Sequence, residues 1–176
     1  MDEAPIYNTG NLFGFFSVFN ADAINNMTLY KGGTPAQYGG RLSSVLAVEA
    51  KEGLTDKFHA NGGIGLISSR LTIESPIKKG KSSILLSGRR TYIDILSKPF
   101  LETGTTSGIP YYFYDLNGKL KFRLSKKDQL TVTGYTGKDD VSLSVLDGRF
   151  ETSFYWTNRA LTCLLYTSDA ADDSLR

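Results

Sequence analysis

The sequence of 176 residues is poor in the side chains on which most enzyme and metal chemistry depends. It contains a single histidine, His59, and a single cysteine, Cys163. These two residues cannot supply a Cys/His zinc site or a disulfide framework, and a histidine-dependent triad would have to use His59 alone. No general acid, base and nucleophile occur with a spacing that suggests catalysis. We therefore expect a protein that is not an enzyme and that holds no cofactor or metal.

Excess charge of one sign and long apolar runs are also missing. Lys and Arg number 20 against 18 Asp and Glu, a formal net charge of +2, which is too small to indicate a nucleic-acid partner. No apolar run approaches the roughly 18 residues of a transmembrane helix. The N-terminus lacks the basic, apolar and small-residue order of a signal peptide, so either the chain is cytoplasmic or its true start is missing.

The residues that are abundant favour β structure. The chain has 18 Gly, 10 Tyr and 10 Phe but only 5 Pro, a mixture typical of strands joined by many turns. In the first third, aromatic residues alternate with Gly and Asn, which predicts loops with apolar anchors. Within this part we expect a short helical turn over Ala21 to Met27 and brief strands over Thr28 to Tyr30 and Ser44 to Ala50.

A nearly complete alternation of polar and apolar side chains runs through residues 111–124. One face carries Tyr112, Tyr114, Leu116, Gly118, Leu120, Phe122 and Leu124, and the other carries Tyr111, Phe113, Asp115, Asn117, Lys119, Lys121 and Arg123. Tyr112 and Phe122 are aromatic residues at the two borders of the apolar face, ten residues apart. At ~3.3 Å per residue and a tilt of about 45°, this separation projects to roughly 23 Å, which is close to the height of the apolar band of an outer-membrane barrel. A half-buried strand of a soluble sheet has the same alternation, so both interpretations stay open.

Neighbouring segments predict further strands. Gln129 to Tyr135 continues the alternation after a polar turn and predicts a hairpin with residues 111–124. Ser82 to Asp94 predicts another strand, on which Arg89 points inward. Lys57 to Ile77 is either one long strand or two strands with a turn near Asn61 to Gly63.

The remaining segments of the second half complete the expected pattern. Leu96 to Ile109 and Lys138 to Arg149 are rich in Gly, Thr, Ser and Asp, so we expect long loops there. Phe150 to Leu161 predicts a last strand, with Phe154 and Trp156 as aromatics at the border of an apolar band. Short turns at one end and long loops at the other are typical of outer-membrane barrels.

A set of turn residues in the first third carries a family resemblance. Its members are Lys31, Gly32, Gly33, Pro35, Tyr38, Gly39, Gly40 and Arg41. With the sequence around them, they resemble the C-terminal half of the plug of TonB-dependent outer-membrane receptors, and especially the large nutrient receptors of Bacteroidetes-type bacteria. The sequence after the plug-like part is also similar to the first barrel strands of that family.

The resemblance implies a mainly β fold. Residues 1–54 would be the C-terminal half of a plug domain, and residues 55–162 would be the first antiparallel strands of a large, incomplete transmembrane β-barrel. The apolar face of residues 111–124 would then meet lipid, and the polar face, together with Arg89, would meet the lumen. Like its relatives, the whole receptor would lie in the bacterial outer membrane.

The same resemblance implies active import of a bulky nutrient, such as a siderophore, cobalamin, glycan or peptide. The implied partners are outer-membrane lipid, a TonB-type energy-transducing protein, the imported nutrient and a surface lipoprotein, with no nucleic acid. The segment that couples to the energy-transducing protein normally precedes the part of the plug represented here.

Two further expectations complete the sequence analysis. Residues 163–176 resemble the translation of a transposase adapter used in DNA sequencing, so we expect a non-native tail after a real end near Leu161. The alternative to the receptor is a secreted, soluble β-sheet module for binding or adhesion, in which a second sheet would cover the apolar face of residues 111–124. The two hypotheses therefore differ in which face of that strand is covered.

Overall fold

A computed structural model confirms a mainly β protein with antiparallel sheets. The structure describes residues 1–2, 4–6, 10–11, 14, 16–39, 44–101, 110–145 and 150–167. The first part of the chain, residues 1–54, is named the N-terminal segment below. Its elements are β1 (Gly10–Asn11), β2 (Phe16–Ser17), η2 (Ala21–Ala23), β3 (Ile24–Tyr30), η3 (Ala36–Tyr38) and β4 (Val45–Ala50).

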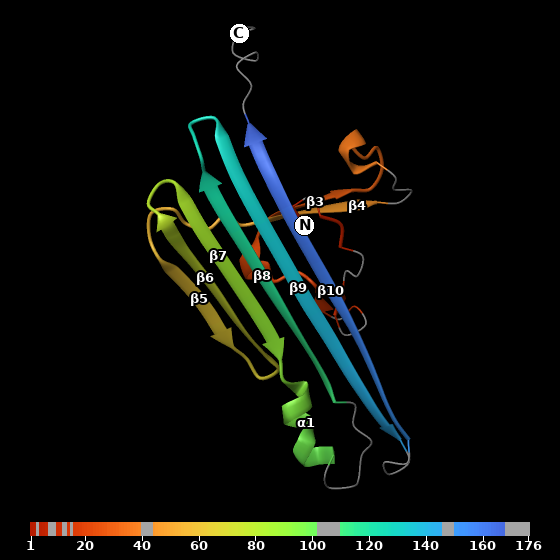
Figure 1. The fold of residues 1–176 in the computed structure, drawn as a ribbon. Helices are drawn as coiled ribbons and strands as arrows, with labels where there is room; N and C mark the ends of the chain where they lie inside the picture. The colour runs from red at the N-terminus through yellow and green to blue at the C-terminus, as the bar shows by residue number, and fades with distance from the viewer. Residues whose placement is uncertain are drawn as a thin grey trace.

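The rest of the chain builds one six-stranded antiparallel sheet in the order β10-β9-β8-β7-β6-β5 (Figure 1). The strands are β5 (His59–Ile64), β6 (Ser68–Lys78), β7 (Ser82–Thr91), β8 (Tyr111–Arg123), β9 (Asp128–Val145) and β10 (Phe150–Thr167). Each strand pairs with the next along the chain, so short hairpin turns are sufficient to connect most of them. The N-terminal segment passes behind this sheet in the view of Figure 1.

The hairpin predicted from residues 111–135 is confirmed as the β8–β9 pair. The strand predicted over Ser82 to Asp94 is β7, which ends earlier, at Thr91. Residues 57–77 form two strands, but the turn lies at residues 65–67 and not near Asn61 to Gly63. The glycine pair inside β5 instead lets β6 approach closely, since a Cβ at Gly62 would lie 3.3 Å from the carbonyl oxygen of Arg70. The helical turn expected over residues 21–27 ends at Ala23, because β3 begins at Ile24 and pairs with β4.

The loop expected over Leu96 to Ile109 is wrong in its first part. Helix α1 (Ile93–Leu101) occupies that part, and residues 102–109 lie outside the described residues. The helix begins at the end of β7, where the amides of Ile95 and Leu96 both donate to the carbonyl of Tyr92. Ile93 packs on a buried cluster of the sheet, and this apolar contact stabilises the helix. The loop is expected from the polar composition of the segment, which does not reveal such a contact.

The loop expected over Lys138 to Arg149 is also largely wrong, because β9 continues to Val145 and β10 begins at Phe150. Ladder pairing to β8 and β10 continues through this polar stretch, for instance between Tyr111 and Val141. Residues 146–149 lie outside the described residues. The last strand continues past its expected end at Leu161 as far as Thr167, which pairs with Asp128. Here the hydrogen bonds between paired strands outweigh the low β-propensity of individual residues.

The buried apolar core is small. Its cluster on the sheet consists of Tyr111, Phe113 and Val141, against which Phe16, Ile93 and Trp156 pack. Trp156 packs on this buried cluster, so its expected role as a border aromatic is wrong. Phe154 pairs with buried Val141 and lies on the same side of β10 as Trp156, but it is 54% exposed. The outward aromatic of this part of β10 is Tyr155, which is 70% exposed.

Among the described residues, no helix has the length and apolar character needed to pass through a membrane.

Gly53 joins the N-terminal segment to the sheet and provides a test of this connection. Its φ is +74°, and an added Cβ would lie 3.0 Å from the carbonyl oxygen of Ile84. We expect Gly53→Ala to lower the free energy of unfolding by about 2 kcal/mol, because it combines an unfavourable left-handed φ with a backbone clash. Urea titration of the chain in non-ionic detergent measures this change.

Gly80→Ala is the matched control for that prediction. Gly80 also has a positive φ, of +69°, but an added Cβ meets nothing within 4 Å. The control should therefore cost about 1 kcal/mol, from the φ alone. Equal losses for the two variants would show that the N-terminal segment does not approach Ile84 closely.

Candidate functional site

The candidate site is the interface between the N-terminal segment and the face of the six-stranded sheet that it covers, which we name the inner face. On β8 this face carries the odd-numbered residues, and several of them are almost fully buried: Phe113, Asp115, Asn117 and Lys119. The alternation that separates polar from apolar side chains along the strand therefore directs the polar set toward the covering segment. The result is an interface with an unusual number of buried polar groups.

An ion pair lies at the centre of the inner face. Arg89 on β7 and Asp115 on β8 are directly opposite one another, and the Nε and Nη2 atoms of Arg89 each lie 2.7 Å from Oδ2 of Asp115. Asp115 is 0% exposed. Nη2 of Arg89 also donates to the carbonyl of Ser17 at 2.7 Å, and its guanidinium lies 4.9 Å from the centroid of the Phe113 ring. One arginine thus joins two strands of the sheet to the N-terminal segment.

A second polar contact holds the beginning of the chain. Nζ of Lys119 lies 3.1 Å from Oδ2 of Asp2 and donates to the carbonyl of Ala50 at 2.9 Å. The same carboxylate accepts from the hydroxyl of Thr133 at 2.8 Å and, through Oδ1, from the amide of Ala50 at 3.0 Å. Because every group here is buried and paired, the cluster fixes the segment without leaving an isolated charge.

Shorter side chains form a third set of contacts nearer β6. Nδ2 of Asn20 donates to Oγ of Ser87 at 2.8 Å, and that hydroxyl is 2.8 Å from the hydroxyl of Thr72. Closer to the sheet edge, Nε of Arg70 lies 2.9 Å from the carboxylate of Asp22. The contacts connect η2 to two neighbouring strands, so they resist sliding of the segment along the sheet.

The chain leaves the interface at Glu52. Its carbonyl accepts a hydrogen bond from Oγ of Ser83 at 2.7 Å, and its carboxylate pairs with Lys121. Predicted inner-face residues therefore contact the N-terminal segment at several points along the sheet, at Arg89, Lys119 and Lys121.

Three buried polar atoms near the central ion pair have no hydrogen-bond partner in the structure. They are Oδ1 of Asp115, Nδ2 of Asn117 and the hydroxyl of Tyr135. A buried polar atom without a partner is costly, so the position favours ordered water.

The opposite face of the sheet, which we name the outer face, is apolar and uncovered by the described elements. Its exposed members include Leu71 at 52%, Leu86 at 51%, Leu116 at 53% and Leu161 at 77%. A shallow groove of about 560 Å³ crosses it where glycines on three neighbouring strands leave space: Gly88, Gly118 and Gly134. A continuous exposed apolar face of this kind is rare on monomeric soluble proteins.

The residues predicted for this outer face lie as the alternation requires. Leu116 and Leu124 are exposed, and Tyr112, Tyr114, Leu120 and Phe122 are partly exposed. On the inner face, Arg123 is the exception, because it lies at the end of β8 and is exposed.

The residues of the plug-like signature are not gathered into the interface. Lys31, Gly32, Gly33 and Pro35 are exposed beyond the end of β3, and Gly39 follows η3. Tyr38 packs on Tyr30 with ring centroids 5.7 Å apart. Gly40 and Arg41 lie outside the described residues. Of the set, the described members thus shape turns at the tip of the β3–β4 hairpin and make none of the interface contacts given above.

Sequence reasoning missed several groups that hold the interface: Asp2, Asn20, Asp22, Thr72, Ser87 and Thr133. Thr72, Ser87 and Thr133 lie on strands, and a signal for them was present in the sequence, because each is at a polar position of an alternating segment. The contacts of Asp2 with β8 and β9 bridge far separated parts of the chain and had no local signal.

Comparisons with protein families, with curated proteins and with solved structures give no match for this chain. Within the described residues, no group of three or more His, Cys, Asp or Glu side chains is arranged to hold a metal ion. The case for function therefore depends on the two faces of the sheet.

Proposed function

We propose that the chain is part of a TonB-dependent receptor of the bacterial outer membrane, which imports a bulky nutrient through a plugged β-barrel. The observation that carries the proposal is the sidedness of the six-stranded sheet, because the covered face holds most of the polar side chains, beside one apolar cluster, and the uncovered face is mainly apolar. In a soluble sheet the apolar face is the covered one. The reverse arrangement suits a barrel wall with lipid outside and a hydrated, filled lumen inside.

In this proposal the N-terminal segment is part of the plug, and the sheet is the beginning of the wall. A wide barrel leaks unless its lumen is filled. The contacts of Arg89, Lys119 and Lys121 with the segment are the kind that a filled lumen needs, since polar groups on both sides satisfy one another.

The polar character of the interface also supports a movable plug. A pull from a TonB-type energy-transducing protein would have to separate the segment from the wall. Water can replace the hydrogen bonds of Asp2, Asn20 and Ser17 as they open, which lowers the cost of separating these polar contacts. The nutrient, an associated surface lipoprotein and the coupling protein belong to the whole receptor and are part of this proposal.

The alternative, a secreted soluble module, needs a second layer over the outer face. The described elements of the N-terminal segment contact the inner face, and Ile93 of α1 packs on the inner cluster. Leu116 remains 53% exposed in this arrangement. The alternative therefore requires a partner that would cover a broad apolar sheet face.

Spin labels at two neighbouring residues of β10 test whether the outer face meets lipid. After Cys163→Ser removes the single thiol of the chain, Leu161→Cys places a label on the outer face, and Thr162→Cys places one on the inner face. In vesicles of zwitterionic phospholipid, we expect the label at residue 161 to be more accessible to oxygen and the label at residue 162 more accessible to a water-soluble nickel chelate. Oxygen concentrates in the hydrocarbon layer, whereas the chelate stays in water.

The two positions are at almost the same depth, so each is a control for the other. Equal and water-like accessibility at both residues would contradict the proposal and favour the soluble module. Unfolding is monitored in parallel through Trp156, the only tryptophan.

A further inference from the structure

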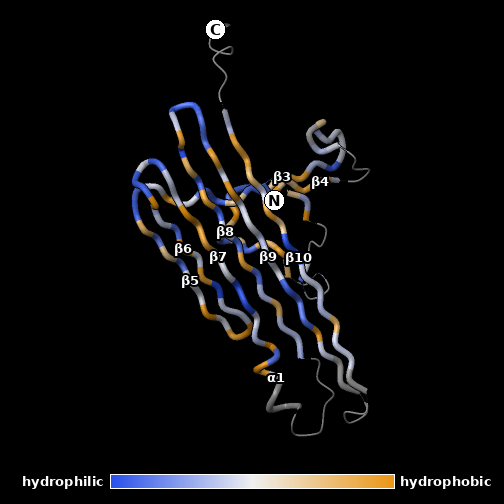
Figure 2. The backbone as a smooth tube through the Cα atoms, viewed as in Figure 1, coloured by the Kyte–Doolittle hydropathy of each residue, from blue (hydrophilic) through white to orange (hydrophobic). Residues whose placement is uncertain are grey.

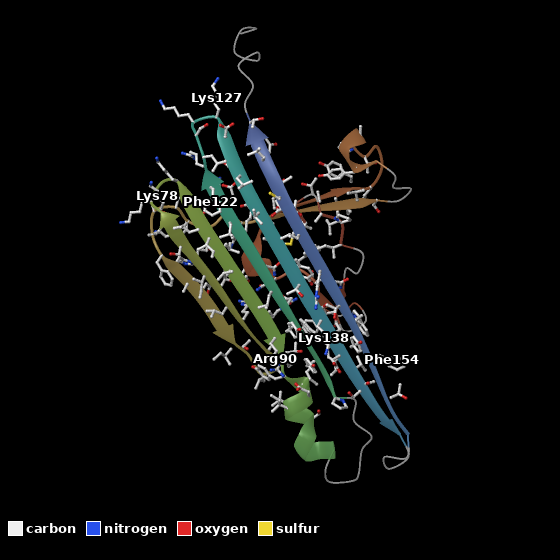
Figure 3. All side chains as sticks on the ribbon, in the orientation of Figure 1. Lys78, Arg90, Phe122, Lys127, Lys138 and Phe154 are labelled. Carbon is white, nitrogen blue, oxygen red and sulfur yellow. The ribbon has the colours of Figure 1, made fainter. Side chains whose placement is uncertain are left out.

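Six exposed lysines gather at one end of the sheet, which we name the lysine end. They are Lys57, Lys78, Lys79, Lys81, Lys126 and Lys127. The β6–β7 and β8–β9 turns that carry most of them are neighbours, because the amide of Arg123 donates to the carbonyl of Lys81 at 2.8 Å. Figure 3 shows Lys78 and Lys127 projecting from this end, and Figure 2 shows its turns in the colour of hydrophilic residues.

The positive charge of the lysine end is not compensated locally. Within the described residues, none of the six lysines makes an ion pair. The acidic residues beside them are Asp56 and Asp128, and the carboxylate of Asp128 accepts a hydrogen bond from Ser125 at 2.6 Å. Six lysines against two carboxylates leave a concentrated positive field.

The other end of the outer face differs in this respect. Arg90 lies 3.6 Å from the carboxylate of Asp94, and Lys138 lies 2.8 Å from that of Asp140. Arg90 and Lys138 are thus paired, so among the described side chains the two ends of the same sheet differ in charge.

Large apolar side chains accompany the lysines. Phe58 is 65% exposed, Ile77 is 53% exposed and Leu124 is 63% exposed. Phe58 follows Lys57 and Ile77 precedes Lys78, whereas Leu124 comes just before the turn that contains Lys126. Lysines beside exposed apolar side chains suit the boundary between headgroups and acyl chains, where both find favourable surroundings.

We propose that the lysine end binds the phosphate headgroups of anionic glycerophospholipids, and so fixes which end of the wall faces a phospholipid leaflet. This inference rests on the proposed function. An acidic protein would satisfy the lysines but would leave Phe58, Ile77 and Leu124 in contact with a polar partner. A lipid leaflet satisfies both sets of side chains at once.

Flotation with vesicles tests the inference on the whole chain, which is added from non-ionic detergent to phosphatidylcholine vesicles with or without phosphatidylglycerol. We expect tighter binding when phosphatidylglycerol is present. Lys78→Gln with Lys127→Gln should reduce affinity for the anionic vesicles about 25-fold, at about fivefold per lysine, and leave binding to neutral vesicles unchanged. High salt should bring the original chain close to the level of the variant.

Arg90→Gln with Lys138→Gln is the matched control, because it removes the same net charge from the other end of the sheet. We expect it to retain most of the binding to anionic vesicles, since those cations are already paired. An equal loss in both double variants, or no gain from phosphatidylglycerol, would overturn the inference. So would a loss of binding to polyaspartate in the lysine variant without any loss on vesicles, which would favour an acidic protein partner.

The neutral vesicles separate this inference from the proposed function. Binding to phosphatidylcholine without any effect of phosphatidylglycerol would contradict the role of the lysine end alone. Binding only to anionic vesicles would support the lysine end and contradict a lipid-facing sheet. Binding to neither kind of vesicle would contradict both.

Discussion

Arg89→Met should lower the free energy of unfolding by about 3–5 kcal/mol, because it leaves the carboxylate of Asp115 buried without its partner. Asp115 is 0% exposed, and its two contacts at 2.7 Å both come from Arg89. The same change removes the hydrogen bond to the carbonyl of Ser17 and loosens the N-terminal segment. Urea titration of the chain in non-ionic detergent, followed by Trp156 fluorescence, measures the loss.

Arg90→Met is the matched control for this prediction. Arg90 is the next residue on the strand, but its side chain points to the outer face, is 53% exposed and lies 3.6 Å from Asp94. An exposed pair of this kind contributes less than about 1 kcal/mol. The double change Arg89→Met with Asp115→Leu should recover most of the stability, since it removes both buried charges. Equal losses for Arg89→Met and Arg90→Met would show that Asp115 is hydrated and not buried by the N-terminal segment.

Leu116→Arg should destabilise the chain in phospholipid vesicles by about 2–4 kcal/mol, the cost of an arginine near the middle of a lipid-facing strand. Leu116 is 53% exposed on the outer face and lines the groove over Gly88 and Gly118. If that face met water, an arginine at a half-exposed position would change the stability by less than about 0.5 kcal/mol. The two hypotheses for the function therefore differ by several-fold in the expected effect. Urea titration in vesicles measures it.

Leu46→Arg is the control, because Leu46 is 41% exposed on β4 of the N-terminal segment and is not on the outer face. Its effect should stay within about 0.5 kcal/mol. If Leu116→Arg lowers the free energy of unfolding as little as Leu46→Arg does, the result would contradict the lipid-facing sheet and favour the soluble module.

Much of the sheet could be predicted from the alternation of side chains. The β8–β9 hairpin and the inward position of Arg89 follow from a period of two residues, which depends on the strand alone. Helix α1 and the long ends of β9 and β10 could not be predicted in this way. They depend on Ile93 packing against the sheet and on ladder pairs between distant segments, and these act against local composition.

Less of the candidate site could be predicted. The alternation identified Asp115, Lys119 and Lys121 as members of one face but gave no indication of their partners in the N-terminal segment. Those partners include Asp2, which lies more than a hundred residues from Lys119 along the chain. The plug-like turn residues were conspicuous in the sequence, and the described ones lie away from the interface contacts.

The sequence by itself determined that the chain is rich in antiparallel β structure and that its strands separate polar from apolar side chains, because both properties are local. Only the tertiary structure decided which of the two faces is covered. That choice depends on where the N-terminal segment lies, and the segment lies on the polar face because Arg89, Lys119 and Ser87 give its polar groups partners there. An apolar face left uncovered by the described residues is the physical basis for the proposed place in a membrane.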